Sequence, residues 1–304
     1  MSVVAVRTSW RTGGWLRGKA IPTLVGVAFL LPASGCADLE AVSKFATESS
    51  QALKQGRLVL EDIEASCIRA HVAEEPIPAD VNQLFDPSLT SKAAADPACA
   101  AYASHQPGEL AVLKVLTDYY TALSQLASTG SASTGKGDSS SSQSAKETSS
   151  EPENVLKAVD GLAGFLGKVA AGGYRERALE KDLKERKDDV TAVVSGLKDI
   201  VQNRYENHSL VEEQQIITRV DLELLGKTSD DAVKALYRAQ WESAMDLIAK
   251  KKAAADAFVK ALDTMQDGYT ALTDTSLKAK DLPSVIQPYT EALSSLIPSI
   301  QKAL

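Results

Sequence analysis

The chain has 304 residues and a formal net charge of −7 at pH 7. An acidic surface repels phosphate groups, which argues against nucleic acid as a partner and against electrostatic adhesion to anionic lipid. Aromatic residues make up only 5% of the chain, whereas Ala, Leu, Glu, Lys, Gln and Ser are abundant. This mixture favours long helices packed through small side chains over a core built from sheets.

Residues 1–35 have the order of a secretory signal peptide. An apolar stretch, residues 20–31, follows a positive flank without acidic residues, which contains Arg7, Arg11, Arg17 and Lys19. A spanning helix needs about 20 apolar residues, so this stretch is too short for a permanent span. Cleavage would remove four positive and no negative charges, which takes the formal charge from −7 to −11.

The end of this segment, Ser34-Gly35-Cys36, resembles a bacterial lipobox, although Ala33 stands where that motif has Leu. The resemblance implies cleavage before Cys36, acylation of its thiol and new amino terminus, and anchoring in the cell envelope. Several buried acyl chains, at about 0.8 kcal/mol per CH₂ group, anchor a protein stably. Lipoproteins of the enteric type that have Asp directly after the Cys stay in the inner membrane. In this chain Ala37 follows Cys36, so the resemblance favours the outer membrane, facing the periplasm, over the inner membrane. The alternative is a plain secreted protein cut after Ala33 or Gly35.

Residues 36–127 form a predicted N-terminal helical part. The first helix runs from residue 38 to about residue 75, where two sets of residues recur every seven positions and trace one stripe. Ser49 and Gly56 on this stripe are small, so we expect the backbone of a partner helix to approach closely there. The two sets are Leu39, Ala46, Leu53, Leu60 and Cys67, and Val42, Ser49, Gly56, Ile63 and Ala70.

A proline-containing connection follows, over residues 76–107, and its five prolines argue against a continuous helix. In an oxidising compartment Cys67 and Cys99 are expected to form a disulfide, which would pin this connection to the first helix. By loop-closure entropy, the bridge is expected to add about 3–4 kcal/mol to the free energy of unfolding. The alternative is two free buried thiols. Pro107 is the expected start of a second helix, residues 108–127.

Residues 128–153 are rich in Ser and Gly and contain no large apolar side chain, which predicts a disordered linker. Residues 154–304 return to helical periodicity. We expect helices over about 154–171, from 174 to Ser209 or residue 225, from 230 to about 275, and over 282–303. Ser209 and Glu212 have capping-box spacing, so the second of these either breaks there or continues. The third repeats Tyr237, Ala244, Lys251, Phe258, Met265 and Leu272 every seven residues.

The predicted fold class is therefore all-α, an elongated bundle of long, antiparallel, partly coiled-coil helices. Beyond the lipobox, "AAGGYRERALEKDL" (residues 170–183) faintly resembles uncharacterised helical envelope proteins of bacteria, and no activity comes with that likeness.

Motifs for chemistry are weak. Residues 130–136 have P-loop spacing, but Gly137 replaces the Ser or Thr that holds Mg²⁺, and no strand precedes them. Cys67 with His71, and His208 with Glu212, have ligand spacing on helices, yet an oxidised Cys67 cannot be a ligand, so no metal site is predicted. Lys250-Lys251-Lys252 is read as a solvated turn. No catalytic residue and no cofactor is predicted.

The sequence thus favours a non-enzymatic, lipid-anchored envelope protein that works as a helical scaffold or interaction module, with an envelope protein or a second copy as partner. Two alternatives belong to other classes. One is a periplasmic sensor that binds a ligand or metal through His71, His208 and neighbouring acids. The other is a hydrolase of envelope polymers, which would require a deep pocket with convergent carboxylates.

Overall fold

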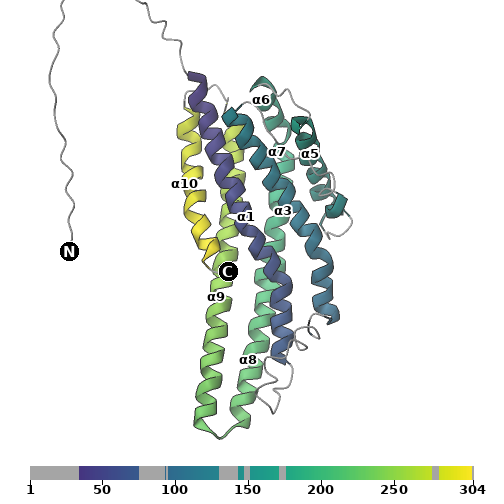
Figure 1. The fold of residues 1–304 in the computed structure, drawn as a ribbon, viewed down its shortest axis with the longest axis vertical. Helices are drawn as coiled ribbons and strands as arrows, with labels where there is room; N and C mark the ends of the chain where they lie inside the picture. Colours follow the sequence, from purple (N-terminus) through teal and green to yellow (C-terminus); the bar gives the residue numbers. More distant parts are fainter. Residues whose placement is uncertain are drawn as a thin grey trace, which may run out of the picture. The chain divides into compact units, whose positions relative to one another are not determined.

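The described residues are helical apart from a few turns and short connections, such as residues 228–230. The computed structural model describes residues 34–74, 93, 95–129, 143–146, 151–170, 176–275 and 281–302, and no strand occurs among these residues. The predicted all-α bundle is confirmed. Its helices, labelled as in Figure 1, are α1 (Ser34–Glu74), α3 (Pro97–Thr129), α5 (Glu153–Ala170), α6 (Glu176–Glu185), α7 (Lys187–Asp199), η2 (Ile200–Ser209), α8 (Leu210–Lys227), α9 (Asp231–Asp274) and α10 (Leu282–Gln301).

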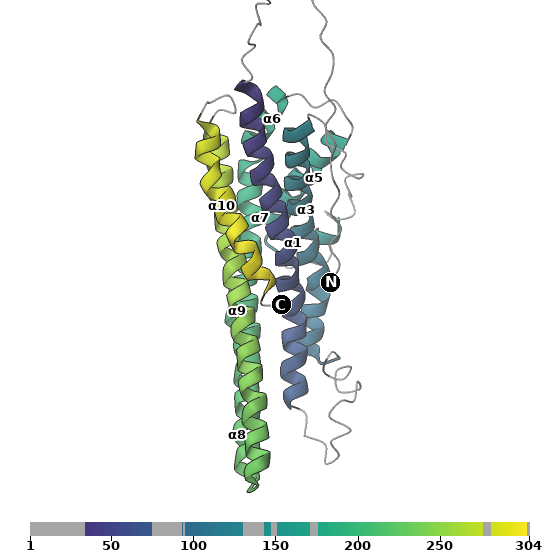
Figure 2. The same ribbon diagram turned by 60° about the vertical axis from the view of Figure 1, so that its left-hand side comes forward.

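Helix α1 is the centre of the bundle within residues 33–304. It packs along α3, α8, α9 and α10, while α5 and α7 pack together and against α3 and α9. Figures 1 and 2 both show α8 and the first half of α9 continuing as an antiparallel pair past the described end of α1. We call this pair, residues 210–248, the α8–α9 hairpin. Its tip lies at the end of the bundle opposite the start of α1 (Figure 1).

The core follows the sevenfold stripes of the sequence. Val42, Leu53 and Leu60 of α1 and Phe258 of α9 are fully buried, so both stripes face other helices of the same chain. An aromatic cluster lies between α3, α5 and α9: the ring of Tyr119 contacts those of Tyr120, Phe165 and Tyr269. The hydroxyls of Tyr119 and Tyr269 lie 2.5 Å apart, and Tyr269 donates to the carbonyl oxygen of Leu183 at 2.9 Å.

Two glycines let α1 and α9 approach closely. A Cβ added at Gly56 would lie 2.1 Å from the ring of Phe258, and one added at Gly268 would lie 2.5 Å from the ring of Phe45. Ser49 is fully buried and donates to the carbonyl oxygen of Phe45 at 2.9 Å. A helix does approach closely at Gly56, as predicted, but it is α9 of the same chain, and this buried face is not open to a helix of another protein.

Gly56→Ala is expected to lower the free energy of unfolding by about 1–3 kcal/mol, the usual cost of overpacking a well-filled core. The ring of Phe258 is fully buried and cannot swing into solvent. Urea denaturation followed by circular dichroism measures the effect. Gly164→Ala is the matched control, because nothing lies within 4 Å of its added Cβ, so it should stabilise by about 0.5–1 kcal/mol. Equal stabilisation by both substitutions would contradict the packing described here.

Helix α3 begins earlier than expected, and Pro107 lies inside it. Asp96 caps the helix by accepting from the backbone N–H of Ala98 at 2.8 Å. Cys99 in the first turn lies beside Cys67 of α1, so this end is held against α1 although Pro107 removes one backbone donor. The prediction that prolines prevent helix before residue 108 is wrong for Pro97 to Pro107.

The expected long segment from residue 174 divides at Arg186 and not at Ser209. Helix α7 passes directly into the π-helical η2 and then into α8. Ser209 has helical backbone dihedrals and makes no side-chain cap; its hydroxyl donates to the carbonyl oxygen of Arg204 at 3.0 Å. The capping box at Ser209 and Glu212 is therefore not formed. Asp230 caps α9, accepting from the backbone N–H of Ala232 at 2.8 Å.

Part of the predicted linker is ordered. Residues 143–146 form a helical turn whose Ala145 is fully buried in the core, and Lys146 lies 2.5 Å from the Asp160 carboxylate. The expectation that this segment has nothing to bury fails at Ala145, because a methyl group suffices to fill a gap between helices. Residues 130–142, with the near-match to a P-loop, lie outside the described residues, as do residues 1–33 of the predicted signal peptide.

Candidate functional site

A group of buried charged and polar side chains joins α1 to η2, α8 and α9. At its centre, the Asp62 carboxylate accepts two hydrogen bonds from Arg69, at 3.0 and 2.9 Å, and two from Lys251 Nζ, at 2.7 and 2.9 Å. Tyr205 donates to the same carboxylate at 2.6 Å. We call this group the Asp62 cluster; its members are Asp62, Ser66, Arg69, Tyr205, Glu213 and Lys251.

Glu213 provides the second carboxylate of the cluster. It accepts from Arg69 Nε at 2.6 Å and from the Ser66 hydroxyl at 2.6 Å. The side chains of Glu213 and Lys251 are 2% and 7% exposed, and that of Asp62 is 12% exposed. The Arg69 side chain is 30% exposed, so two largely buried carboxylates face one buried and one partly exposed cation, and the charges of the group balance.

The pKa values of the cluster follow from this balance. Burial opposes the charge of Asp62, but the hydrogen bonds and charge of Arg69, with the bonds from Lys251 and Tyr205, hold the pKa of Asp62 below its usual range. Burial lowers the pKa of Lys251, against the effect of Asp62. Burial and the Asp62 carboxylate raise the pKa of the Tyr205 hydroxyl. The tyrosine therefore stays a neutral donor at physiological pH.

The π-helix η2 presents successive side chains to two separate groups. Tyr205 enters the Asp62 cluster, and Arg204 pairs with Glu109 of α3 and with Glu151, whose oxygen lies 3.4 Å away. π-Helical turns often occur at functional sites. Here two adjacent residues of η2 contact two different groups of charged side chains, Tyr205 the Asp62 cluster and Arg204 the carboxylates of Glu109 and Glu151.

Around Arg204 the carboxylates outnumber the cation. Burial raises the pKa of Glu151 to about 7, Arg204 opposes the rise, and the charges of Glu109 and Asp199 add to it. Burial also raises the pKa of Glu109, against Arg204 and His105. Two carboxylates that share one guanidinium in a buried place favour uptake of a proton.

The Glu151 proton makes stability depend on pH. The folded state holds it up to pH about 7, whereas the ordinary value is 4.5, so this group's contribution to stability is lost as pH rises through that window. As pH rises, Glu151→Gln is expected to lose less free energy of unfolding than the parent protein does. Urea denaturation from acidic to mildly alkaline pH measures the difference. Glu153→Gln, whose parent side chain is 82% exposed, is the control. Parallel pH profiles for Glu151→Gln and the parent would contradict this assignment.

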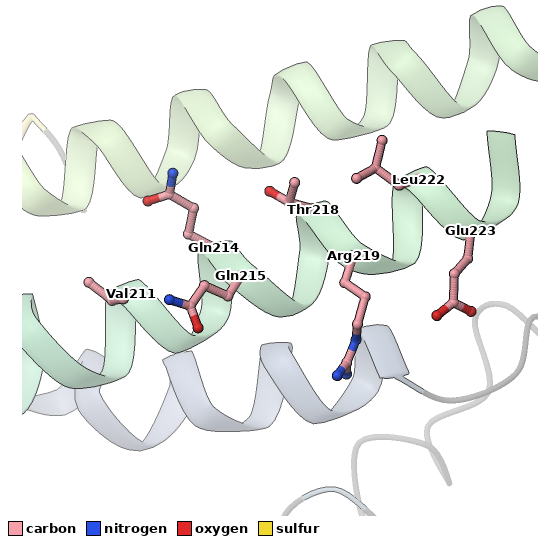
Figure 3. A pocket seen from close by; sticks show the side chains of 7 residues that line it. All are labelled: Val211, Gln214, Gln215, Thr218, Arg219, Leu222 and Glu223. Atoms are coloured by element: carbon pink, nitrogen blue, oxygen red, sulfur yellow. The ribbon is translucent and has the colours of Figure 1, made fainter. Parts of the chain in front are cut away.

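Three surface grooves of the described residues differ in the carboxylates that they contain. One of about 720 Å³ runs along α8 and contains one carboxylate, that of Glu223; in Figure 3 Gln214, Thr218 and Leu222 point toward α9 and Arg219 points away from it. A second, of about 500 Å³ between α1 and α3, contains none. A third, between α1 and α10, contains Glu40 and Glu291, each engaged by a side chain of its own helix.

The structure brings together one pair of the predicted site residues. The sulfur atoms of Cys67 and Cys99 lie 2.05 Å apart and their Cα atoms 5.5 Å apart, in the range that a disulfide spans. His71 and His208 lie on different helices: His71 is near Asp96, at 3.8 Å, and His208 near Glu212, at 3.7 Å. Cys36 lies in the first turn of α1, where the structure describes the backbone but not the side chain.

Sequence reasoning missed the Asp62 cluster. Lys251 was assigned to a solvated turn, but it is 5% exposed and bound to Asp62. The signal was present, since Lys251 occupies a core position of the sevenfold stripe of α9, and Asp62 and Arg69 are seven residues apart on α1. A charged residue at a heptad core position indicates a buried partner.

Comparison with known proteins gives no further assignment: no protein-family model, curated protein or solved structure matches the chain. Within the residues that the structure describes, no helix is both long and apolar enough to span a membrane.

Proposed function

We propose that the chain is a non-enzymatic, lipid-anchored protein of the bacterial cell envelope that binds a helix of a partner protein through the α8–α9 hairpin. The observation that carries this proposal is an exposed apolar stripe on the first half of α9. Leu236 and Leu247 are 56% and 41% exposed. Exposed small residues continue the same face; they are Ala232, Ala235, Ala239 and Ser243.

The stripe is the second apolar face of this part of α9. Val233, Tyr237, Trp241 and Ile248 lie on the opposite side, since an α-helix turns by about 100° per residue. That side packs against α8, where Trp241 Nε1 donates to the Thr218 hydroxyl at 3.4 Å. The face toward α8 therefore holds the hairpin together, and the outer stripe has no partner within the described residues.

The residue types on the stripe suit a helical partner. Its members recur at intervals of three and four residues, so they form a ridge along the helix axis. Leucine separated by alanine and serine lets another helix approach closely while leucine side chains fill the gaps, as in coiled coils. Exposed apolar patches of this kind mark protein–protein contacts more often than chance surfaces do.

The proposed anchor and the hairpin lie at opposite ends of α1. The acylated residue would be Cys36, in the first turn of that helix, and the hairpin tip lies beyond its other end (Figure 1). A helix of 41 residues is about 60 Å long at 1.5 Å per residue. Anchored at Cys36, the protein would present the stripe well away from the lipid headgroups, at a height suited to another envelope protein.

Site-specific photocrosslinking in intact cells tests the proposal. A photoreactive residue at Leu236 is expected to capture one defined helical partner, whereas the same residue at Arg238, exposed on the flank of α9, should capture much less. Crosslinks between two copies would identify the protein itself as the partner. Equal capture at both positions, or none at either in an anchored and folded protein, would refute the docking face.

The anchor is tested separately. Intact-mass measurement of the membrane fraction is expected to show an amino terminus at Cys36 that carries acyl chains, and Cys36→Ala should move the protein to the soluble fraction. An unmodified amino terminus would contradict the proposed lipid anchor, but binding through the α9 stripe could still be tested with purified components.

A further inference from the structure

Three side chains with metal-binding atoms converge where α1 meets the start of α3. Cys67 and His71 lie one turn apart on α1, and Cys99 lies in the first turn of α3. One ligand atom from each lies within 4.8 Å of the other two. Both cysteines are buried, and the His71 side chain is 22% exposed. In the oxidised protein the two sulfurs are bonded to each other and are not available as ligands.

Reduction would change the chemistry of this place without moving its helices. A dithiol reductant transfers two electrons and two protons: the bond between the sulfurs breaks, two thiols form, and the reductant becomes a disulfide. Near the cysteines, Gln106 of α3 donates to the carbonyl oxygen of Glu61 of α1 at 3.2 Å, and further along the two helices share buried packing and the Ser50–Thr121 hydrogen bond at 2.8 Å. The thiols therefore stay near His71.

We propose that reduction of the Cys67–Cys99 disulfide opens a zinc site whose protein ligands are Cys67, Cys99 and His71. Two thiolates and an imidazole are a ligand set that Zn²⁺ prefers, and binding releases the two thiol protons. Zinc–sulfur bonds of about 2.3 Å at a tetrahedral angle place two sulfurs about 3.8 Å apart, a separation that small side-chain rotations can reach. These three residues would leave the fourth position of a tetrahedral site to a water molecule.

The site would be controlled by redox state, since disulfide and metal compete for the same sulfurs. In the oxidised protein the disulfide links α1 to α3, and in the reduced protein the bound metal would link them instead. This proposal is independent of the lipid anchor and of the docking stripe on α9.

Cobalt and zinc titration of the purified protein tests it. After anaerobic reduction and removal of the reductant, Co²⁺ is expected to give visible d–d bands and thiolate charge-transfer absorption of a tetrahedral site, saturating at one ion per chain, and Zn²⁺ should displace it. The oxidised protein should give neither. Zinc should raise Tm of the reduced protein and leave Tm of the oxidised protein unchanged.

Matched variants separate the proposed ligands from incidental binding. His71→Ala should weaken zinc binding by at least about 10–100-fold, the loss that even an outer-shell partner causes, while His208→Ala in η2 should bind as the parent does. Circular dichroism of the reduced protein establishes that it is folded. Equal binding by oxidised and reduced protein, no binding by folded reduced protein, or equal loss in the two histidine variants would overturn the proposal.

Discussion

Asp62→Ala is expected to lower the free energy of unfolding by about 3–5 kcal/mol, the cost of removing one partner from a buried ion pair. The substitution takes away the acceptor of Arg69, Lys251 and Tyr205 together and leaves Lys251 charged at 7% exposure. Equilibrium denaturation in urea, followed by circular dichroism, gives the difference. Because Tyr205 belongs to η2 and Lys251 to α9, the loss weakens two contacts of α1 with other helices at once.

Two controls identify the cause of that loss. Glu40→Ala removes an exposed carboxylate from a pair with Lys44, whose side chains are 65% and 67% exposed, and exposed pairs of this kind contribute little to stability. Asp62→Asn keeps the shape and removes the charge. Because the folded pKa of Asp62 is lowered, the charge stabilises above the unfolded pKa and the benefit is lost as pH falls through the folded value. The gap between parent and Asp62→Asn should therefore narrow in acid; a constant gap would exclude a charge effect.

Removal of the Cys67–Cys99 disulfide is expected to cost about 3–4 kcal/mol by the chain-entropy estimate. The two cysteines are 32 residues apart, and the bridge closes the connection between α1 and α3. Cys67→Ala combined with Cys99→Ala, compared with the parent in urea without metal, measures the cost. Reduction should lower the midpoint of the parent and leave that of the double variant unchanged. A parent that does not respond to reductant would show that the bridge contributes nothing.

The sevenfold stripes allowed most helices to be predicted. Val42, Leu53 and Leu60 of α1, and Phe258 and Leu272 of α9, are buried as their spacing requires. This worked because heptad spacing reports burial along a straight helix, whatever covers that face. It does not report the covering element, which explains why Ser49 and Gly56 were assigned to an external partner when α9 and other helices of the same chain cover them.

Charged residues and proline were misjudged for a related reason. Lys251 and Glu213 carry charges that local sequence assigns to solvent, yet long-range partners on α1 neutralise both. Local sequence preference places Pro107 at a helix boundary, whereas tertiary contacts at Cys99 and along α3 keep the helix continuous through it. In each case a contact between residues distant in sequence overrides the local preference, and one sequence does not encode that contact in a readable way.

The pairing of Phe45 with Gly268, of Gly56 with Phe258 and of Asp62 with Lys251 fixes the alignment of α1 against α9. The three contacts have almost the same spacing along the two antiparallel helices. Each pairs two residues of different size or charge, so neither residue could replace the other. Sliding α9 by one turn would push two rings against side chains that have a Cβ and would leave an ammonium group facing hydrocarbon. Helix interfaces built from leucine alone tolerate such shifts, whereas these six residues favour one register of α1 against α9.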